Sequence, residues 1–454
     1  MASSSSAVLH RNVNEPPQQA VGGEGSYLVL DDGRKVLDAT GGAAVACLGH
    51  GHPEVKRAMV EQIDKLAYAH TAFFTIQPFE ELANLLVEST DCKMSRLYII
   101  SSGSEAMEAA MKLARQYFLE MANPQPQRTR FIARKQSYHG TTLGSLSMGG
   151  HVYRREPFQP LLLDNISHVS PCYAYRGKKD GESDADYVRR LAEELDAEFQ
   201  RVGPETVCAF VAEPVVGAAL GCVPAVPGYF QAMKAVCDKY GALLIVDEVM
   251  SGMGRCGTLH AWQHEGVAPD LQTIGKGLGG GYAPVGGVLI GQRVADVLAS
   301  GSGCFRHGQT YQGHPVACAA ALAVQRVIRQ ENLLENVKTM GTLLEQELKS
   351  RLSSHPHVGD IRGRGLFWGI EFVKDKATKE PFARSLRVGE TVMDTALSPK
   401  YNISLYAGSG SVDGVQGDHI IIAPPYNSTR EEILRIAELT QKVIEDVFSR
   451  ITTS

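Results

Sequence analysis

The 454-residue chain has no Cys-x-x-Cys pair, no block of basic residues, and no apolar run near the ~20 residues that cross a bilayer. Its nine cysteines are scattered, which favours reduced thiols in a reducing compartment over a disulfide framework. Lys and Arg number 45 against 50 Asp and Glu, a net charge of −5. Without a basic tail or patch, nucleic acid is not an expected partner, and neither is a membrane.

The sequence also lacks the patterns of a secretory signal and of a metal site. The first residues contain no charged start followed by an apolar stretch, so they do not form a secretory signal. A Ser-rich, Arg-poor start leaves an organellar transit peptide open as an alternative, but the expected location is cytoplasmic. The pairs His50/His52 and His307/His314 lack the spacing of a metal site on one helix face, so we expect no metal.

Short apolar runs bounded by turn residues alternate with helix-like segments through the middle of the chain. This alternation predicts an α/β fold with a mainly parallel central sheet and helices on both faces. After about residue 330, strand-like and helix-like segments mix, which indicates a smaller α+β domain. We therefore expect an N-terminal segment (1–60) that contributes to the small domain, a large domain (61–330) and a C-terminal small domain (331–454). The predicted central strands are 96–101, 131–133, 207–212, 243–246 and 288–290.

Lys276 stands between glycines just after the apolar run that ends at Ile274. A lysine on a rigid strand end suits an enzyme that forms an imine with a carbonyl cofactor, although Gly-Lys-Gly also occurs in ordinary loops. Asp247 ends another apolar run, and a buried carboxylate is costly unless it is paired. A protonated pyridine nitrogen would be such a partner, whereas a structural Asp that caps the next turn is the alternative. The lysine and the acid together suggest pyridoxal phosphate.

The segment 101–106, Ser-Ser-Gly-Ser-Glu-Ala, lies between a predicted strand and a predicted helix. Free amides at a helix start, beside small residues that let an anion approach, can bind phosphate. A plain N-cap with Glu105 in the first turn explains the segment equally well.

Three more polar residues follow predicted strands, at the edge where open α/β sheets bind ligands. Tyr138 could stack on a flat cofactor ring, and an ordinary loop aromatic is the alternative. Glu213 could orient that aromatic or meet a charged substrate group, and a plain loop acid is as consistent with the local sequence. Glu248 is expected to face the other side of its strand, as a structural ion-pair partner.

In this order the motifs resemble those of the class III, fold-type I pyridoxal-phosphate aminotransferases, which include ornithine, 4-aminobutyrate and ω-amino acid or amine:pyruvate transaminases. The resemblance extends from Gly49 to Pro425. The motifs are Ser-Gly-Ser-Glu-Ala (102–106), Tyr-His-Gly (138–140), Glu-Pro (213–214), Asp-Glu-Val (247–249), Lys276, and a threonine before Gly-His-Pro.

The resemblance implies a role for each residue. Gly103 and Ser104 would contact the phosphate, Tyr138 and Val249 would cover the two faces of the ring, and Asp247 would bind the pyridine nitrogen. Lys276 would form the imine, with Glu213 nearby. Thr310 would reach the phosphate of the neighbouring subunit, which implies a homodimer with shared active sites.

The reaction that the resemblance implies is a ping-pong transfer of an amino group from a primary amine or ω-amino compound to a keto acid such as pyruvate, with Lys276 moving the proton. A decarboxylase, aminomutase or racemase with the same cofactor is the alternative, and an inactive cofactor-binding protein is a third. Some positions depart from relatives: Met250 replaces a glutamine, Cys256 a threonine and Ala44 a bulky tryptophan. Residues 403–414 also lack the carboxylate-binding arginine of many amine:pyruvate transaminases. These departures favour a larger or less polar amine in a roomier pocket.

Overall fold

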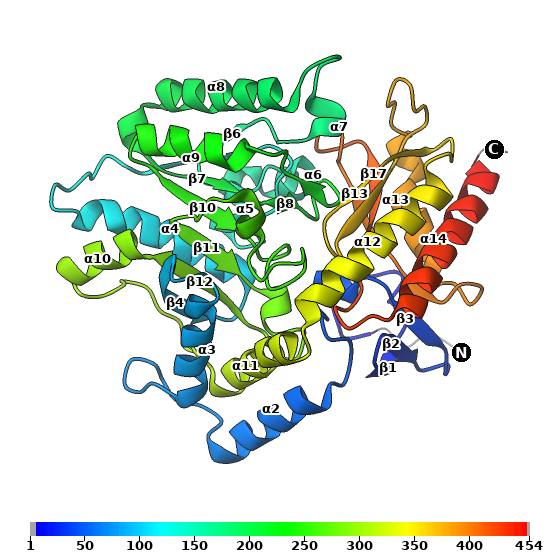
Figure 1. The fold of residues 1–454 in the computed structure, drawn as a ribbon, viewed down its shortest axis with the longest axis horizontal. Coiled ribbons are helices and arrows are strands. Elements are labelled where there is room, and N and C mark those ends of the chain that lie inside the picture. The colour runs from blue at the N-terminus through cyan, green and yellow to red at the C-terminus, as the bar shows by residue number, and fades with distance from the viewer. Residues whose placement is uncertain (1–5, 452–454) are drawn as a thin grey trace.

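The computed structural model describes residues 6–451, and its largest element is a seven-stranded sheet on one side of the molecule (Figure 1). Neighbouring strands are parallel from β11 to β6, whereas β12 runs antiparallel to both β11 and β4. The prediction of a mainly parallel sheet is confirmed, with the run around Leu289 as its antiparallel member. In spatial order the strands are β4 (Met94–Ile100), β12 (Gly286–Gly291), β11 (Leu271–Ile274), β10 (Leu243–Asp247), β7 (Val207–Ala212), β5 (Arg130–Arg134) and β6 (Ile166–Val169).

Helices cover both faces of this sheet because its strands alternate between two apolar clusters. Along β7, Val211 joins the cluster under α4 (Gly103–Glu120) and α10 (Gln292–Ser300), whereas Phe210 joins the cluster under α8 (Asp184–Val202) and α9 (Tyr229–Lys239). Every residue of β7 and β10 is buried, as expected of strands that have a helical layer on each side. A third cluster joins the sheet to α3 (Gln77–Glu88) and α11 (Pro315–Gln330).

The C-terminal part lies on the other side of the molecule, and α12 (Leu333–Leu352) follows α11 towards it (Figure 1). There, one apolar cluster joins an antiparallel four-stranded sheet to α12, α13 (Val388–Leu397) and α14 (Arg430–Ile451). The strand order is β13 (Val358–Gly363), β14 (Trp368–Phe372), β17 (Asp418–Ile422) and β16 (Tyr406–Ser409).

The N-terminal strands pair with a strand from the far end of the chain, because β3 is parallel to β15. The order of this sheet is β1 (Ala20–Glu24), β2 (Tyr27–Leu30), β3 (Lys35–Asp38) and β15 (Ile403–Ser404). The domain bounds 1–60, 61–330 and 331–454 stay a prediction.

The remaining elements are short, apart from α2. They are α1 (Gly41–Ala44), α2 (Pro53–Lys65), α5 (Leu143–Met148), α6 (Val152–Arg155), α7 (Ala174–Gly177), β8 (Val215–Val216), β9 (Val223–Pro224), and the 3₁₀ turns η1 (Glu156–Leu161), η2 (Pro204–Thr206), η3 (Ala261–Glu265), η4 (Lys276–Leu278) and η5 (Arg384–Leu386). None of the helices within residues 6–451 is long and apolar enough to span a bilayer. The cytoplasmic location stays a prediction.

Strand direction positions the candidate site. Because β12 is antiparallel to both neighbours, β4 runs the same way as β11, β10, β7 and β5. The carboxyl ends of these five strands therefore meet at one edge of the sheet. Open α/β sheets bind ligands at such an edge.

Candidate active site

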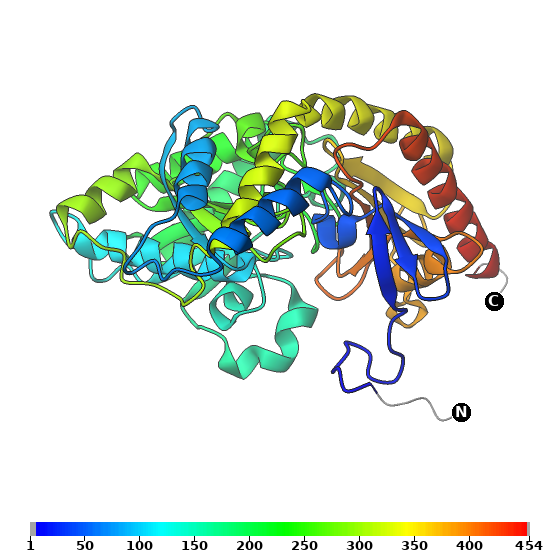
Figure 2. The same ribbon diagram turned by 90° about the horizontal axis from the view of Figure 1, so that it is seen from below.

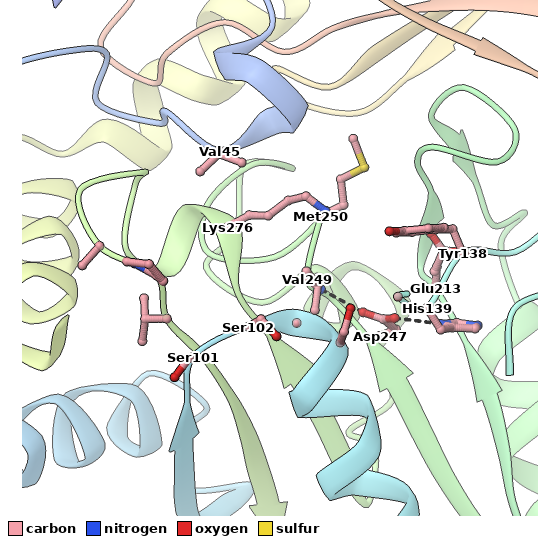
Figure 3. A pocket seen from close by; sticks show the side chains of 16 residues that line it. Val45, Ser101, Ser102, Tyr138, His139, Glu213, Asp247, Val249, Met250 and Lys276 are labelled. Atoms are coloured by element: carbon pink, nitrogen blue, oxygen red, sulfur yellow. Dashed lines mark hydrogen bonds and ion pairs between the residues drawn. The ribbon is translucent and has the colours of Figure 1, made fainter. Parts of the chain in front are cut away.

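A cavity of about 260 Å³ opens at this edge, and most of the residues predicted for the site line it (Figure 3). They come from the ends of several strands and from the start of α4, among other segments. The lining residues are Val45, Ser101, Ser102, Gly103, Ser104, Tyr138, His139, Gly140, Glu213, Asp247, Val249, Met250, Lys276, Ala283, Pro284 and Val285.

The first turn of α4 forms one end of the cavity. The Ser102 hydroxyl accepts the amide hydrogen of Glu105 at 3.2 Å, so the N-cap interpretation is right. The cap leaves the amides of Gly103 and Ser104, which have no carbonyl of their own helix to bind, beside the cavity. A side chain at Gly103 would put its Cβ 2.6 Å from Cγ1 of Val249, so only glycine lets the helix begin this close to the Asp247 strand. Capping and anion binding are therefore compatible at this turn.

Asp247 lies at the floor of the cavity, at the end of β10, and its carboxylate is held by several donors (Figure 3). Oδ1 accepts hydrogen bonds from the Val249 amide at 3.0 Å and the Thr273 hydroxyl at 2.9 Å. Oδ2 is 2.7 Å from Nδ1 of His139, a buried side chain whose Nε2 has no partner within the described residues. Burial of Asp247 therefore does not by itself require a cofactor, because the protein already supplies three hydrogen-bond donors to its carboxylate. The Asp247 carboxylate does give the cavity a negative charge in a fixed position.

His139 is the residue that sequence reasoning missed. It was named only as part of the segment 138–140, between the aromatic and the glycine. A histidine 108 positions from an aspartate gives no local signal of their contact, and the motif itself was the sole indication.

Glu213 holds the loop that carries Tyr138. Its Oε1 accepts the Tyr138 amide hydrogen at 3.1 Å, and its Oε2 accepts that of Gly217 at 3.2 Å. Burial raises the pKa of the Glu213 carboxyl, and the negative charge of Asp247 raises it further. The Tyr138 hydroxyl points into the open space of the cavity (Figure 3).

Lys276 follows β11 by two residues and begins the short turn η4, with a positive φ of 44°. Its side chain extends into the cavity (Figure 3), and it forms no ion pair with any described residue. Burial lowers the pKa of the Lys276 amine, and the positive charge of Arg154 adds to this, although Asp247 and Glu213 act in the opposite direction. A lowered pKa leaves more of the neutral amine, which is the form that attacks a carbonyl carbon.

The departures from the resembled family fall at different places. Met250 lines the cavity. Ala44 does not: its side chain belongs to a buried cluster with Met250 and Cys256, and its neighbour Val45 lines the cavity instead. The small Ala44 side chain therefore does not widen the cavity directly, contrary to the expectation from the sequence.

Two further expectations have different outcomes. Glu248 is buried, but it is not an ion-pair partner of any described cation. Its carboxylate accepts hydrogen bonds from the amides of Ala261 and Trp262 and from Gln272, and burial raises its pKa to about 8. Thr310 is exposed and does not line the cavity of its own chain.

The arrangement fits pyridoxal phosphate. The α4 turn offers amides to an anion, Asp247 offers a negative charge to a protonated ring nitrogen, and Tyr138 and Val249 offer surfaces for a flat ring. Lys276 offers an amine of lowered pKa. The chain also matches the family model described as "Aminotransferase class-III" over residues 8–439. This protein belongs to the class III aminotransferases. It is therefore a pyridoxal-phosphate enzyme, as expected from the sequence.

Other comparisons agree with this assignment. An aminotransferase of Gibberella zeae is 54% identical to this aminotransferase over 437 residues, 96% of this chain and 85% of that protein. Gamma aminobutyrate transaminase 3, chloroplastic, of Solanum lycopersicum is 35% identical, over 94% of this chain and 80% of its own length. The crystal structure of an (S)-enantioselective ω-transaminase from Thermomicrobium roseum has a TM-score of 0.90 at 38% identity and covers 97% of this chain and 96% of that one. The predicted fold-type I architecture is confirmed.

A first prediction concerns the contact between His139 and Asp247. His139→Leu removes one of the three donors to the buried carboxylate, and we expect it to weaken pyridoxal-phosphate binding by about 5- to 150-fold, the range for the loss of one hydrogen bond at a buried polar group. His139→Asn, whose amide can donate from near the Nδ1 position, is the matched control and should recover part of the affinity. Equilibrium binding followed by absorbance measures both. Equal affinity of wild type and His139→Leu would contradict this role.

A second prediction uses the lowered pKa of Lys276. Below the ordinary lysine pKa of 10.5, the unfolded chain binds the proton more tightly than the folded chain does, so folding without cofactor is opposed. Lys276→Met should make the cofactor-free protein more stable than wild type at neutral pH. The difference should shrink as pH rises towards 10.5, because the wild-type protein gains stability in that direction. Urea unfolding at several pH values tests this, and a wild type more stable than Lys276→Met at pH 7 would refute it.

Proposed function

We propose that this class III aminotransferase transfers an amino group from a primary amine or ω-amino compound to a keto acid, with pyruvate as the acceptor. The observation that supports this most is the placing of the Lys276 amine in a cavity bounded by the Asp247 carboxylate and the amides of the α4 turn. One relative is named as a gamma aminobutyrate transaminase and one similar structure as an ω-transaminase, which agrees with the proposed donor class.

Pyridoxal phosphate supplies the electron sink that stabilises negative charge at the substrate carbon. The Nζ of Lys276 would hold the cofactor covalently, and after the donor displaces it, would take the proton from the substrate carbon and return it. Its lowered pKa supports this double use, because it makes the neutral amine, the form that takes a proton, more accessible than in an exposed lysine.

The other site residues would bind and orient. Gly103 and Ser104 would hold the phosphate through their amides. Asp247 would keep the ring nitrogen protonated, and its contact with His139 fixes the direction of its carboxylate. Tyr138 and Val249 would cover the two ring faces, and Glu213 fixes Tyr138 through its backbone amide.

The donor should include amines that have no carboxylate. Residues 403–414 contain no arginine, and the cavity lining contains Val45, Met250 and Val285 among its apolar members. An apolar wall favours a hydrophobic substituent over a charged one. No observation favours the decarboxylase, aminomutase or racemase over the transaminase.

A homodimer is part of this proposal. Phe73 and Phe74 are 76% and 67% exposed, and Tyr311, beside Thr310, is 59% exposed. Tyr68 contacts the Tyr311 ring and donates a hydrogen bond to the Thr310 carbonyl at 2.8 Å, so the two exposed segments are joined. Such an apolar surface suits burial against a second copy. That second copy would bring Thr310 to the phosphate in the neighbouring site.

A third prediction tests the reaction. Protein loaded with pyridoxal phosphate should lose its visible absorption band when mixed with primary amines that have or lack a carboxylate, and pyruvate should restore the band and yield alanine in a stoichiometric amount. A panel of amines, each followed by stopped-flow absorbance and product analysis, measures this. Carbon dioxide release without alanine would favour the decarboxylase, and no response to any amine would reject the transaminase.

A fourth prediction tests the shared site by complementation. Lys276→Met and Thr310→Asp should each be inactive as homodimers, the second because its carboxylate repels the phosphate. A mixed dimer, isolated with two affinity tags, should regain activity, because one of its two sites combines an intact Lys276 with an intact Thr310. If each site were built from one chain alone, the mixed dimer would have no complete site and would stay inactive.

A further inference from the structure

The cavity offers a substrate carboxylate few partners. Lys276 is the one cation among the described residues that line it, and it is engaged in the chemistry. Yet a keto-acid acceptor always carries a carboxylate beside its carbonyl group. A guanidinium is the side chain best matched to a carboxylate, because two parallel N–H groups meet the two oxygens.

We propose that Arg154 is the carboxylate-binding residue of this site, which rests on the proposed transfer to a keto acid. Arg154 belongs to α6, which is separated in sequence from residues 403–414, and its guanidinium carbon lies 4.9 Å from the centroid of the Tyr138 ring. Tyr138 in turn lines the cavity. The guanidinium is therefore held one aromatic ring away from the reacting space.

The charge of Arg154 also reaches the site. It lowers the pKa of the Tyr138 hydroxyl, against the larger rise that burial causes, and it contributes to the lowered pKa of the Lys276 amine. Both effects require Arg154 to be near the groups around which a substrate must fit. An anion bound beside Tyr138 would face this positive charge.

Arg154 has no carboxylate within ion-pair distance among residues 6–451, although it is partly buried. Three other partly or fully buried arginines each have an acceptor for their guanidinium. Arg176 and Arg362 both pair with Glu371, and Arg155 donates to the Gly149 carbonyl at 2.9 Å. A partly desolvated cation without an anion is unfavourable for stability. The contact with the Tyr138 ring is a cation–π contact, and no described residue accepts a hydrogen bond from the guanidinium, so its N–H groups are available to a ligand.

Arg11 is the competing cation. It belongs to the exposed N-terminal segment, and its charge also lowers the pKa of Tyr138. Figure 2 shows this segment (blue) and the teal-green stretch that contains α6 projecting on the same side of the molecule. Arg154 is favoured because it alone of the two contacts the Tyr138 ring and affects Lys276.

The test compares two acceptors that differ in the carboxylate, pyruvate and acetaldehyde. Protein is first converted to its amino form by a donor amine, and the return of the visible band is followed at increasing acceptor concentration. We expect Arg154→Gln to lower the second-order rate constant for pyruvate by about 10- to 150-fold, mainly through weaker binding. The second-order rate constant for acetaldehyde should change by less than about 3-fold. Arg154→Lys should recover part of the pyruvate effect.

Two control variants make the result specific. Arg384→Gln removes an exposed cation whose guanidinium carbon lies 4.6 Å from the ring centroid of Tyr153, the neighbour of Arg154, and should leave both acceptors unaffected. Arg11→Gln tests the competing cation, and a selective loss there instead would overturn the assignment. Equal losses for both acceptors in Arg154→Gln, or no loss for either, would also overturn it.

A binding measurement separates this inference from the proposed reaction. Calorimetric titration of the cofactor-loaded protein with propionate, a carboxylate that cannot accept an amino group, should show binding that Arg154→Gln weakens by the same factor. If wild type transferred no amino group to any acceptor, the proposed function would fail, while selective loss of propionate binding would still support Arg154. Unchanged propionate affinity in Arg154→Gln would count against it in either case.

Discussion

Asp247 places a carboxylate at the end of a strand that is covered on both faces, and donors from three different segments hold it there. The Val249 amide, the Thr273 hydroxyl and His139 satisfy the oxygens, which makes a buried charge tolerable. Because β10 is the middle strand of the seven-stranded sheet, this charge faces the place where the Lys276 turn, the Tyr138 loop and the start of α4 converge. The groups that hold this strand end, His139, Val249 and Thr273, are thereby tied to one another around it.

The electrostatics of the cavity follow from that position. Asp247 and Glu213 are two acids near Lys276, yet burial outweighs their attraction and lowers the lysine pKa. Asp247 also raises the pKa of Glu213, so the two acids do not act as equivalent charges. Arg154 adds a cation against the Tyr138 ring. The site thus has a negative floor, an amine of lowered pKa and a cation beside Tyr138, which together suit a cationic ring nitrogen and an anionic substrate group.

Much of this edge could be predicted from the sequence, because the relevant signals are local. Apolar runs that end in a polar residue marked β10 and β7, and Ser102 before Gly103 marked the start of α4. The direction of β12 could not be predicted, since antiparallel and parallel strands that are buried on both faces have the same composition. Contacts between distant segments could not be predicted either, because packing decides them and they leave no periodic pattern in the sequence. Examples are the contacts of His139 with Asp247, of Glu248 with the amides of residues 261–262, and of Arg154 with the Tyr138 ring. Ala44 was expected at the pocket, whereas Val45 lines it; the backbone of α1 departs from helical angles just before, at Gly42 and Ala43.

The central claim is that the amine of Lys276 binds the cofactor covalently. Reduction of the cofactor-loaded protein with borohydride would make that bond permanent, and peptide mapping by mass spectrometry would then locate it. The account predicts one pyridoxyl phosphate group per chain, on the peptide that contains Lys276. A label on another lysine, or none on any peptide of a protein that shows the visible band, would contradict it.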